Sequence, residues 1–355
     1  MFRLNKKEFQ KWVYDKKVNH YLKRLVTLTI PFKEYRRSLR NRLQNKYFKN
    51  KMRNIVKEKY SDAYVLFSRN GVGDVFFVAS LINEFKKNHK GKVIYLTEKK
   101  SIQKFLKSFS SIDEVLYDKD FGVFQGMAIV QRRIRKGQIN FLYFPYRGNK
   151  PNYVFADSYA NLLELPLDTE RDLPQICEED IKMSNDEFKR LNINPQKTII
   201  LIPENVMWNY KVLSPKFWKT LAIQIEKLGY DVVFNSNNRE YKNFKTTFLP
   251  ICAFVDFAFK VKHVISFRSG IDDLLVGMGM KNLTAIYPNN MEVIWADKFL
   301  FDELLNKYHV KTKEFELENL MHIYSLNSNF NTNVNEIIYD GFEEDLLETL
   351  IDIIK

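Results

Sequence analysis

A glycine-rich turn delivers one carboxylate to the start of a helix. It reads Arg69-Asn-Gly-Val-Gly-Asp74 and joins an apolar run to a segment of helical periodicity. A dinucleotide-binding GxGxxG fingerprint would need a third glycine where Phe76 stands, and the Gly-Lys-Ser/Thr ending of a P-loop is absent. What remains is a tight turn that presents one carboxylate, Asp74, at a helix N-terminus. Helix capping is a sufficient explanation for an aspartate at this position.

Two further turns could bind phosphate. Arg268-Ser-Gly-Ile-Asp272 ends an apolar run and opens a helix, so Ser269, Gly270 and the first helix amides could hold an anion. Lys211 lies just before another helix start, where a cation gains nothing from the helix dipole. An ordinary strand–helix turn and a surface lysine remain open explanations for these two features.

Short apolar runs alternate with helical periodicity along the chain, which predicts parallel sheets covered by helices. Strands are expected over 64–68, 93–97, 114–117, 140–145, 198–203, 231–234, 263–267 and 283–287. Helices are expected over 75–85, 100–109, 125–136, 215–228 and 346–354, and from about 271. The fold class is therefore α/β, with two similar Rossmann-like sheets facing each other across a cleft.

Composition shifts divide the chain into five parts. They are a basic arm (1–60), an acceptor-side α/β domain (61–165), a linker with two prolines (166–190), a second α/β domain (191–340) and a terminal helix (341–355). A length of 355 residues agrees with two domains. The sequence gives no indication of the oligomeric state.

The positive charge of the chain is concentrated at its start. Lys and Arg number 56 against 43 Asp and Glu, a net charge of +13; residues 1–60 carry +15 and the remainder −2. This excludes a uniformly basic nucleic-acid binder. Cations interleaved with aromatic and aliphatic groups favour binding of the arm to an anionic membrane surface. A helical hairpin packed on the body, a protein partner or a nucleic-acid contact stay open for the arm.

Cysteine and hydropathy patterns exclude several classes. Cys177 and Cys252 cannot form a disulfide framework, and no Cys/His cluster indicates a metal site. No run of 18 apolar residues could span a bilayer, and no signal peptide is evident. His263 precedes a strand and is interpreted as structural. We expect a protein of the cytoplasm, peripheral on the inner face of the cell membrane.

The three turns, in this order and in tandem α/β domains, resemble the heptosyltransferase-type family of GT-B glycosyltransferases. The family's Gly-Asp-Val/Ile loop matches Gly73-Asp-Val75, and its lysine loop matches Tyr210-Lys-Val-Leu-Ser-Pro215 with one residue inserted. Its Asp-Ser/Thr-Gly-x-x-His loop reads Arg268-Ser-Gly-Ile-Asp-Asp273 here. The resemblance covers most of 61–290. Since Arg268 replaces an acid and Asp273 a histidine, ADP-heptose itself is not the predicted donor.

The resemblance implies an inverting, metal-independent transferase that moves a sugar from a nucleotide-sugar to a saccharide acceptor. The expected pathway is bacterial lipopolysaccharide-, capsule- or glycolipid-type synthesis, with no cofactor besides the donor substrate. Asp74 would be the general base. Donor-phosphate contacts would come from Lys211, Arg268, Ser269 and Gly270. Weaker candidates are Asn237, Asn238, Glu240, Asp272 and Asp273 for the donor, and Asn70, Gly73, Tyr146, Arg147 and Lys150 for the acceptor.

Three other classes remain as alternatives. An NAD-type oxidoreductase or epimerase is disfavoured by the missing third glycine. A catalytically inactive, transferase-like scaffold at the membrane is favoured by the departures at Arg268 and Asp273. A nucleic-acid binder would use the basic arm and would show steeply salt-dependent binding that disappears without residues 1–60.

Overall fold

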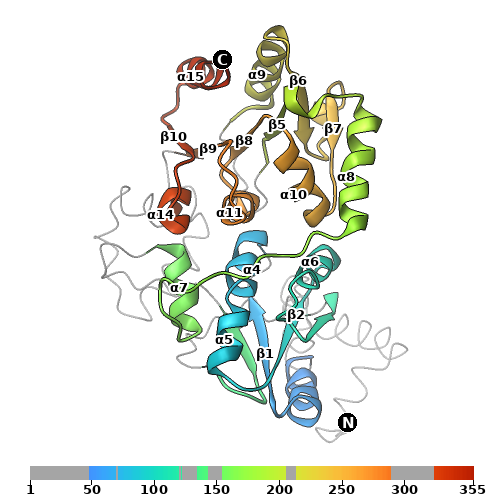
Figure 1. The fold of residues 1–355 in the computed structure, drawn as a ribbon, viewed down its shortest axis with the longest axis vertical. Helices are drawn as coiled ribbons and strands as arrows, with labels where there is room; N and C mark the ends of the chain where they lie inside the picture. Colours follow the sequence, from blue (N-terminus) through green and yellow to red (C-terminus); the bar gives the residue numbers. More distant parts are fainter. Residues whose placement is uncertain are drawn as a thin grey trace, which may run out of the picture.

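The computed structural model contains two parallel β-sheets, each flanked by helices (Figure 1). It describes residues 48–68, 71–119, 121, 134–142, 154–204, 213–288 and 324–355. The first sheet has the order β3-β2-β1-β4, and the second the order β10-β9-β8-β5-β6-β7. All neighbouring strands are parallel. In both sheets the chain moves outward from a central strand and then returns to its other side, which is the Rossmann-like arrangement.

All eight predicted strands are present, and short edge strands extend the second sheet. The first sheet comprises β1 (Ala63–Ser68), β2 (Lys92–Thr97), β3 (Glu114–Tyr117) and β4 (Ile139–Leu142). The second comprises β5 (Thr198–Ile202), β6 (Asp231–Asn235), β7 (Lys245–Thr247), β8 (His263–Phe267), β9 (Leu283–Pro288) and β10 (Asn335–Tyr339). The edge strands β7 and β10 were not predicted, because their polar and half-exposed residues lack the continuous apolar pattern of a buried strand.

The helices of the first domain differ from the prediction at a break and in a helix over 155–162 that was not predicted. They are α4 (Val72–Ala79), α5 (Ile82–Asn88), α6 (Lys100–Leu106) and α7 (Phe155–Leu162). The single helix expected over 75–85 is divided between α4 and α5. The break lies at Ser80, whose carbonyl accepts a 2.7 Å hydrogen bond from the backbone N–H of Asp172 in the linker. Of the helix expected over 125–136, residues 134–136 are not helical and the rest lie outside the described residues.

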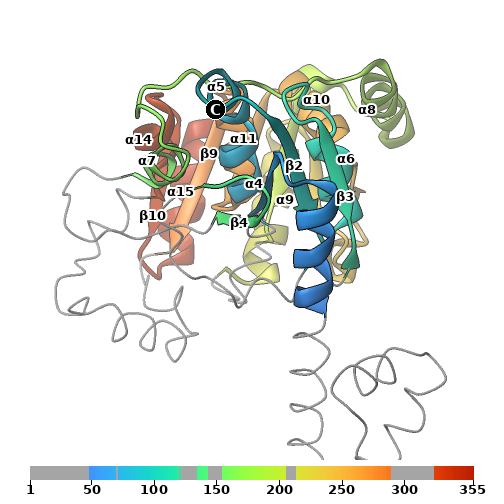
Figure 2. The same ribbon diagram turned by 90° about the horizontal axis from the view of Figure 1, so that it is seen from below.

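A helix over residues 48–59 packs against the first sheet. Phe48, Met52 and Val56 recur every fourth residue, are buried, and join a core cluster with residues of β1 and β2. Figure 2 shows this blue helix lying across the strands of the first sheet. The last part of the predicted basic arm is therefore part of the first domain. Residues 1–47 lie outside the described part of the chain.

The second domain has helices on both sides of its sheet. They are α8 (Glu178–Leu191), α9 (Pro215–Lys227), α10 (Ile251–Lys260), α11 (Gly270–Gly277), α14 (Leu326–Phe330) and α15 (Glu343–Ile354), with 3₁₀ turns at Pro195–Lys197 and Arg239–Tyr241. The predicted start of α9 is confirmed, because the Ser214 hydroxyl accepts a 3.0 Å hydrogen bond from the Phe217 N–H. Gly229 follows the end of α9 with φ +88°, which glycine adopts without strain.

The predicted linker over 166–190 is only partly irregular. Its second half forms most of α8, which packs on α10 with the Phe188 and Phe257 rings stacked at a centroid distance of 4.2 Å. The acidic first turn and basic last turn of α8 complement the helix dipole. The irregular part crosses the first domain, where Gln175 N–H donates to the Ser108 carbonyl at 2.8 Å. Both ends of this segment are therefore held by hydrogen bonds or packing.

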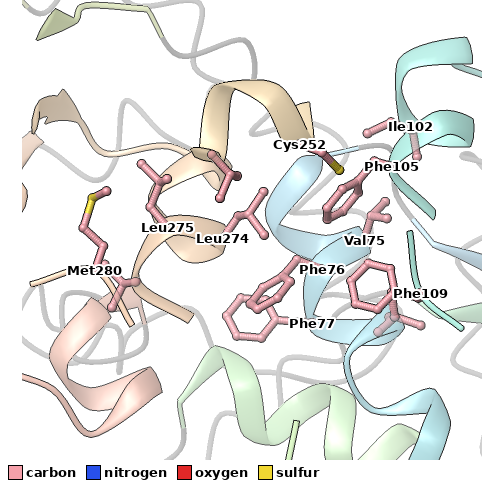
Figure 3. Packing of buried hydrophobic residues seen from close by; sticks show 14 of the residues in the cluster. Val75, Phe76, Phe77, Ile102, Phe105, Phe109, Cys252, Leu274, Leu275 and Met280 are labelled. Atoms are coloured by element: carbon pink, nitrogen blue, oxygen red, sulfur yellow. The ribbon is translucent and has the colours of Figure 1, made fainter. Parts of the chain in front are cut away.

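One hydrophobic cluster continues from the first domain into the second. Val75, Phe76 and Phe77 of α4 share it with Leu274 and Leu275 of α11, and Figure 3 shows these side chains side by side. All five are fully buried. The two sheets are therefore joined through α4 and α11. Of these helices, α4 begins at the predicted Asp74 turn and α11 at the predicted Arg268–Asp272 turn.

Candidate active site

The carboxyl ends of the central strands lead into α4 and α11. In the first sheet the strand order reverses between β1 and β4, and α4 follows β1. In the second sheet it reverses between β5 and β8, and α11 follows β8. Such switch points are where doubly wound α/β proteins bind ligands. The fold thus places two of the three predicted turns at the expected positions.

The starts of α4 and α11 are in backbone contact. A methyl group built on Gly270 would lie 2.6 Å from the Gly73 nitrogen, and one built on Gly73 would meet the carboxylate of Asp273. Only glycine fits at either position without moving a helix. Farther along, Gly277 accommodates the ring of Phe76 in the same way. Because both helices begin here, two positive dipole ends converge on one place.

Asp74 is a buried carboxylate in the first turn of α4. Its Oδ1 accepts a 2.6 Å hydrogen bond from the hydroxyl of Tyr159 in α7, a residue far away in the sequence. The hydroxyls of Ser68 and Tyr95 bond to each other at the end of the same sheet. Burial raises the pKa of Tyr95, and the charge of Asp74 adds to this rise. The cap position of α4 is Gly71, so Asp74 is not the N-cap residue.

Arg268 and Asp273 form a buried ion pair. Arg268 Nη2 bonds to Asp273 Oδ1, and Nη1 lies 3.2 Å from Asp273 Oδ2. The guanidinium also donates to the backbone carbonyls of Tyr324 and Ser269. Burial is the largest single influence and lowers the pKa of Arg268, but the charges of Asp273, Tyr287 and Asp272, together with the hydrogen bond to Asp273, raise it overall. These two predicted donor contacts are thus engaged with each other in this structure.

Ser269 and Asp272 begin α11. The Ser269 N–H donates to Asp272 Oδ2 at 2.6 Å, which secures the helix start. Burial raises the pKa of Asp272 to about 6. The Ser269 hydroxyl is buried and forms no hydrogen bond within the described part of the chain. Asp272 therefore has a capping contact, whereas Ser269 keeps an unused hydroxyl at the predicted phosphate turn.

The predicted donor contacts after β6 are on the surface. Asn237 is exposed, and the Asn238 side chain accepts a 3.1 Å hydrogen bond from the Glu240 N–H. The Glu240 carboxylate forms a 2.9 Å ion pair with Lys219. Asn238 and Glu240 thus make local contacts that shape this turn.

Glu204 was not among the site residues predicted from the sequence. It follows β5 at the switch point, and its Oε1 accepts a 2.9 Å hydrogen bond from the hydroxyl of Ser236 at the end of β6. Burial of Tyr241 raises the pKa of its hydroxyl, and the charge of Glu204 adds to this rise. A single glutamate after a strand forms no recognisable motif. Its hydrogen-bond partner follows the neighbouring strand β6, and the sequence does not show that the two strand ends lie together.

Arg171 is a second missed residue, in the predicted linker. Its Cζ lies 5.1 Å from the ring centroids of both Phe77 in α4 and Phe330 in α14. Burial lowers the pKa of Arg171 to about 10, while the carboxylates of Asp273 and Asp157 act in the opposite direction. An arginine between two prolines is expected to be a solvated linker residue. Its contacts with Phe77 and Phe330 become evident only in the folded structure.

Several predicted residues lie outside the described part of the chain. They are Asn70 of the first turn, the acceptor-side candidates Tyr146, Arg147 and Lys150, and the lysine of the second turn, Lys211. Within the residues that the structure describes, no group of three or more His, Cys, Asp or Glu side chains could hold a metal ion. No helix in those same ranges is both long and apolar enough to cross a membrane.

Two Rossmann-like sheets joined at their ligand-binding edges define the GT-B class of α/β folds. The fold matches that of the E. coli ADP-heptose lipopolysaccharide heptosyltransferase II, with a TM-score of 0.52 and 11% sequence identity. That match covers 82% of this chain and 98% of the other. No family model and no curated protein matches the sequence. The resemblance is therefore one of fold.

Two weaker structural matches are also found. A glycosyltransferase family 9 protein from Veillonella parvula gives a TM-score of 0.47 at 14% identity, covering 64% of this chain and 81% of its own. The E. coli heptosyltransferase WaaC with ADP gives 0.44 at 8% identity, covering 82% of this chain and 99% of its own. The activities in these names are those of the matched proteins.

Proposed function

We propose that this chain is a glycosyltransferase that transfers a sugar from a nucleotide-sugar donor to a saccharide acceptor. The observation that supports it best is the backbone contact between Gly73, which precedes the buried carboxylate Asp74, and Gly270 of the second turn, at the joined edges of two parallel sheets. One turn offers a base and the other an anion site, and a GT-B enzyme needs both.

The proposed reaction is a single displacement with inversion at the anomeric carbon. Asp74 removes the proton of the acceptor hydroxyl, whose oxygen attacks the anomeric carbon of the donor. The bond to the diphosphate breaks, and the leaving nucleoside diphosphate takes the electron pair. The amides that begin α11 and Lys211 would stabilise its charge without a metal ion. Asp74 would hold the proton until solvent removes it.

The proposed acceptor is a saccharide of a bacterial cell-surface polysaccharide or glycolipid. The strongly basic composition of residues 1–60 supports attachment to an anionic membrane, which would place the enzyme at the cytoplasmic face near lipid-linked acceptors. The described helix over 48–59 exposes Lys51, Arg53, Lys57 and Lys59 on the side away from the sheet. These cations could face such a surface.

Asp74→Asn tests this function. The amide keeps the shape of the side chain but cannot accept the proton, so turnover should fall roughly 10²- to 10⁴-fold. Nucleoside diphosphate affinity should stay near that of the wild type. Release of nucleoside diphosphate from a nucleotide-sugar panel, with envelope saccharide extract as acceptor, provides the assay. An Asn variant with wild-type turnover would show that Asp74 only stabilises its helix.

The second candidate is an inactive, transferase-like scaffold. It is favoured by the ion pair between Arg268 and Asp273, because a guanidinium used inside the protein is not free for a donor phosphate. This candidate predicts no stabilisation by any nucleoside diphosphate. Thermal unfolding with and without nucleoside diphosphates therefore decides between the two functions.

A further inference from the structure

Helix α14 of the second domain lies against the first domain beside α7 (Figure 1). The ring of Phe330, at the end of α14, stacks on that of Phe77 in α4 with the centroids 5.3 Å apart. The ring of Tyr324, just before α14, lies 5.6 Å from that of Phe155 in α7. The two domains therefore meet at α14 as well as at the starts of α4 and α11.

An asparagine of α14 caps α7 across this contact. The Ala156 N–H, in the first turn of α7, donates a 2.6 Å hydrogen bond to Asn329 Oδ1, and both residues are buried. The first amides of a helix have no acceptor within the helix, and they are usually capped by a side-chain oxygen of the preceding residue. In α7 that position is occupied by Val154, whose side chain contains no oxygen. The second domain therefore supplies an acceptor that the cap residue of α7 lacks.

The second domain also fixes the direction of the Asn329 amide. Its Nδ2 donates to the Ser325 carbonyl at 2.7 Å, so only one orientation of the amide satisfies both this contact and the cap of α7. The Ser325 hydroxyl donates in turn to the Glu336 carboxylate of β10 at 2.8 Å. Just before α14, the Tyr324 carbonyl accepts hydrogen bonds from Arg268. Asn329 is thus held through β10 and the turn that precedes α11.

Helix α7 carries this contact to the candidate base. Tyr159 lies one helix turn after Ala156, on the same side of α7. Its hydroxyl donates the 2.6 Å hydrogen bond to Asp74 Oδ1, and both side chains are buried. In a closely packed interior, a shift in the first turn of α7 moves the Tyr159 hydroxyl as well. Asn329, α7 and Tyr159 therefore connect the second domain to the carboxylate of the first.

We propose that Asn329 is a positioning residue for the Asp74 carboxylate, acting from the second domain through α7 and Tyr159. This inference rests on the proposed function, because it concerns proton removal by Asp74. While the domains are in contact, the cap keeps the first turn of α7 formed and the Tyr159 hydroxyl in place. That hydroxyl fixes the direction of the carboxylate that takes the proton. Separation of the domains would withdraw the cap, so the base is oriented only where the two substrates meet.

Transfer kinetics of Asn329→Ala and Tyr159→Phe, alone and combined, test this connection. Asn329→Ala should lower kcat about 3- to 10-fold with KM nearly unchanged, since it disturbs the base without removing a substrate contact. In the Tyr159→Phe background, Asn329→Ala should change kcat less than about 2-fold, because the connection is already broken. Asn329→Asp keeps an acceptor for the Ala156 N–H and adds a charge that suits a helix start, so it should restore most of the lost kcat.

Hydrogen–deuterium exchange measures the cap without any substrate. The first amides of α7 should exchange at least about 3-fold faster in Asn329→Ala than in the wild type. Asn194→Ala is the matched control, because Asn194 is an exposed asparagine whose side chain accepts the Gln196 N–H at the start of another turn, at 3.0 Å. This control should leave both the exchange of α7 and kcat unchanged.

The outcomes separate this inference from the proposed function. Equal kcat in the wild type and Asn329→Ala, or losses that multiply in the double variant, overturn the role of Asn329. If the wild type transfers sugar from no donor, the proposed function fails and the role in proton removal fails with it. Faster exchange of α7 in Asn329→Ala would then still support the interdomain cap, and unchanged exchange would overturn it. If Asn329→Ala does not fold, Asn329→Leu replaces it in each comparison, since leucine has a similar size and no acceptor.

Discussion

Gly270→Ala should force the two domains apart at their closest contact. The new methyl carbon would lie 2.6 Å from the Gly73 nitrogen, whereas ordinary contact begins at 3.4 Å. The start of α11 must therefore move away from α4 by about 0.8 Å, or the variant must tolerate a backbone clash. Overpacking of this kind costs about 1 to 3 kcal/mol. Gly270 has no positive φ, so steric contact alone determines the effect.

Thermal unfolding without ligand measures that cost. At roughly 2 to 4 °C per kcal/mol, Gly270→Ala should lower the Tm by about 2 to 12 °C. Ser269→Ala is the control, because it adds no atoms and removes a hydroxyl with no described partner; its Tm should match the wild type. Pyrophosphate affinity should also fall in Gly270→Ala, since the displaced helix start is the proposed anion site. A Gly270→Ala protein with wild-type Tm and affinity would refute the close contact of α4 and α11.

Three further predictions address Asp74, pH and the helix over 48–59. Tyr159→Phe removes a hydrogen bond to a buried carboxylate and should lower kcat at least about 10-fold with KM nearly unchanged, measured in the transfer assay that is used for Asp74. Burial lowers the pKa of His263 to about 4, below its value in the unfolded chain. Between pH 7 and pH 5 the unfolded chain therefore takes up a proton at His263 that the folded protein does not. The free energy of unfolding should fall by about 2 kcal/mol over this range. His263→Gln should lose that pH dependence in denaturant titrations. In the same denaturant titration, Met52→Ala should lower the free energy of unfolding by about 2 to 5 kcal/mol, because Met52 is buried. The exposed control Lys51→Ala should lower it by under about 0.5 kcal/mol. Equal small effects of the two substitutions would contradict the packing of this helix.

The central strands and the helix starts were predictable because their signals are local. A run such as Thr198–Ile202 is apolar throughout, and Ser214 followed by proline caps a helix by its own hydroxyl. The division of α4 from α5 was not predictable. It depends on a hydrogen bond from Asp172, which is distant in sequence. Likewise α8 is polar on most of its surface, and its packing on α10 requires knowledge of the second sheet.

The candidate site was predictable in its turns but not in its partners. Glycine at 73 and 270 indicated tight turns, yet their contact with each other appears only when the two sheets are assembled. Tyr159 and Arg171 carried no motif, because each acquires its role from a residue in another element. The pairing of Arg268 with Asp273 also follows from adjacent turns of one helix start, a geometry that the sequence alone did not reveal.

The central claim is that the second domain binds a nucleoside diphosphate, and a thermal-shift panel tests it most directly. The wild type and Lys211→Ala are melted with UDP, GDP, CDP, ADP, CMP and NAD. We expect one nucleoside diphosphate, at 100 times its dissociation constant, to stabilise the wild type by about 2.7 kcal/mol and the variant by clearly less. Stabilisation by NAD alone, or by none of the six, would contradict the claim.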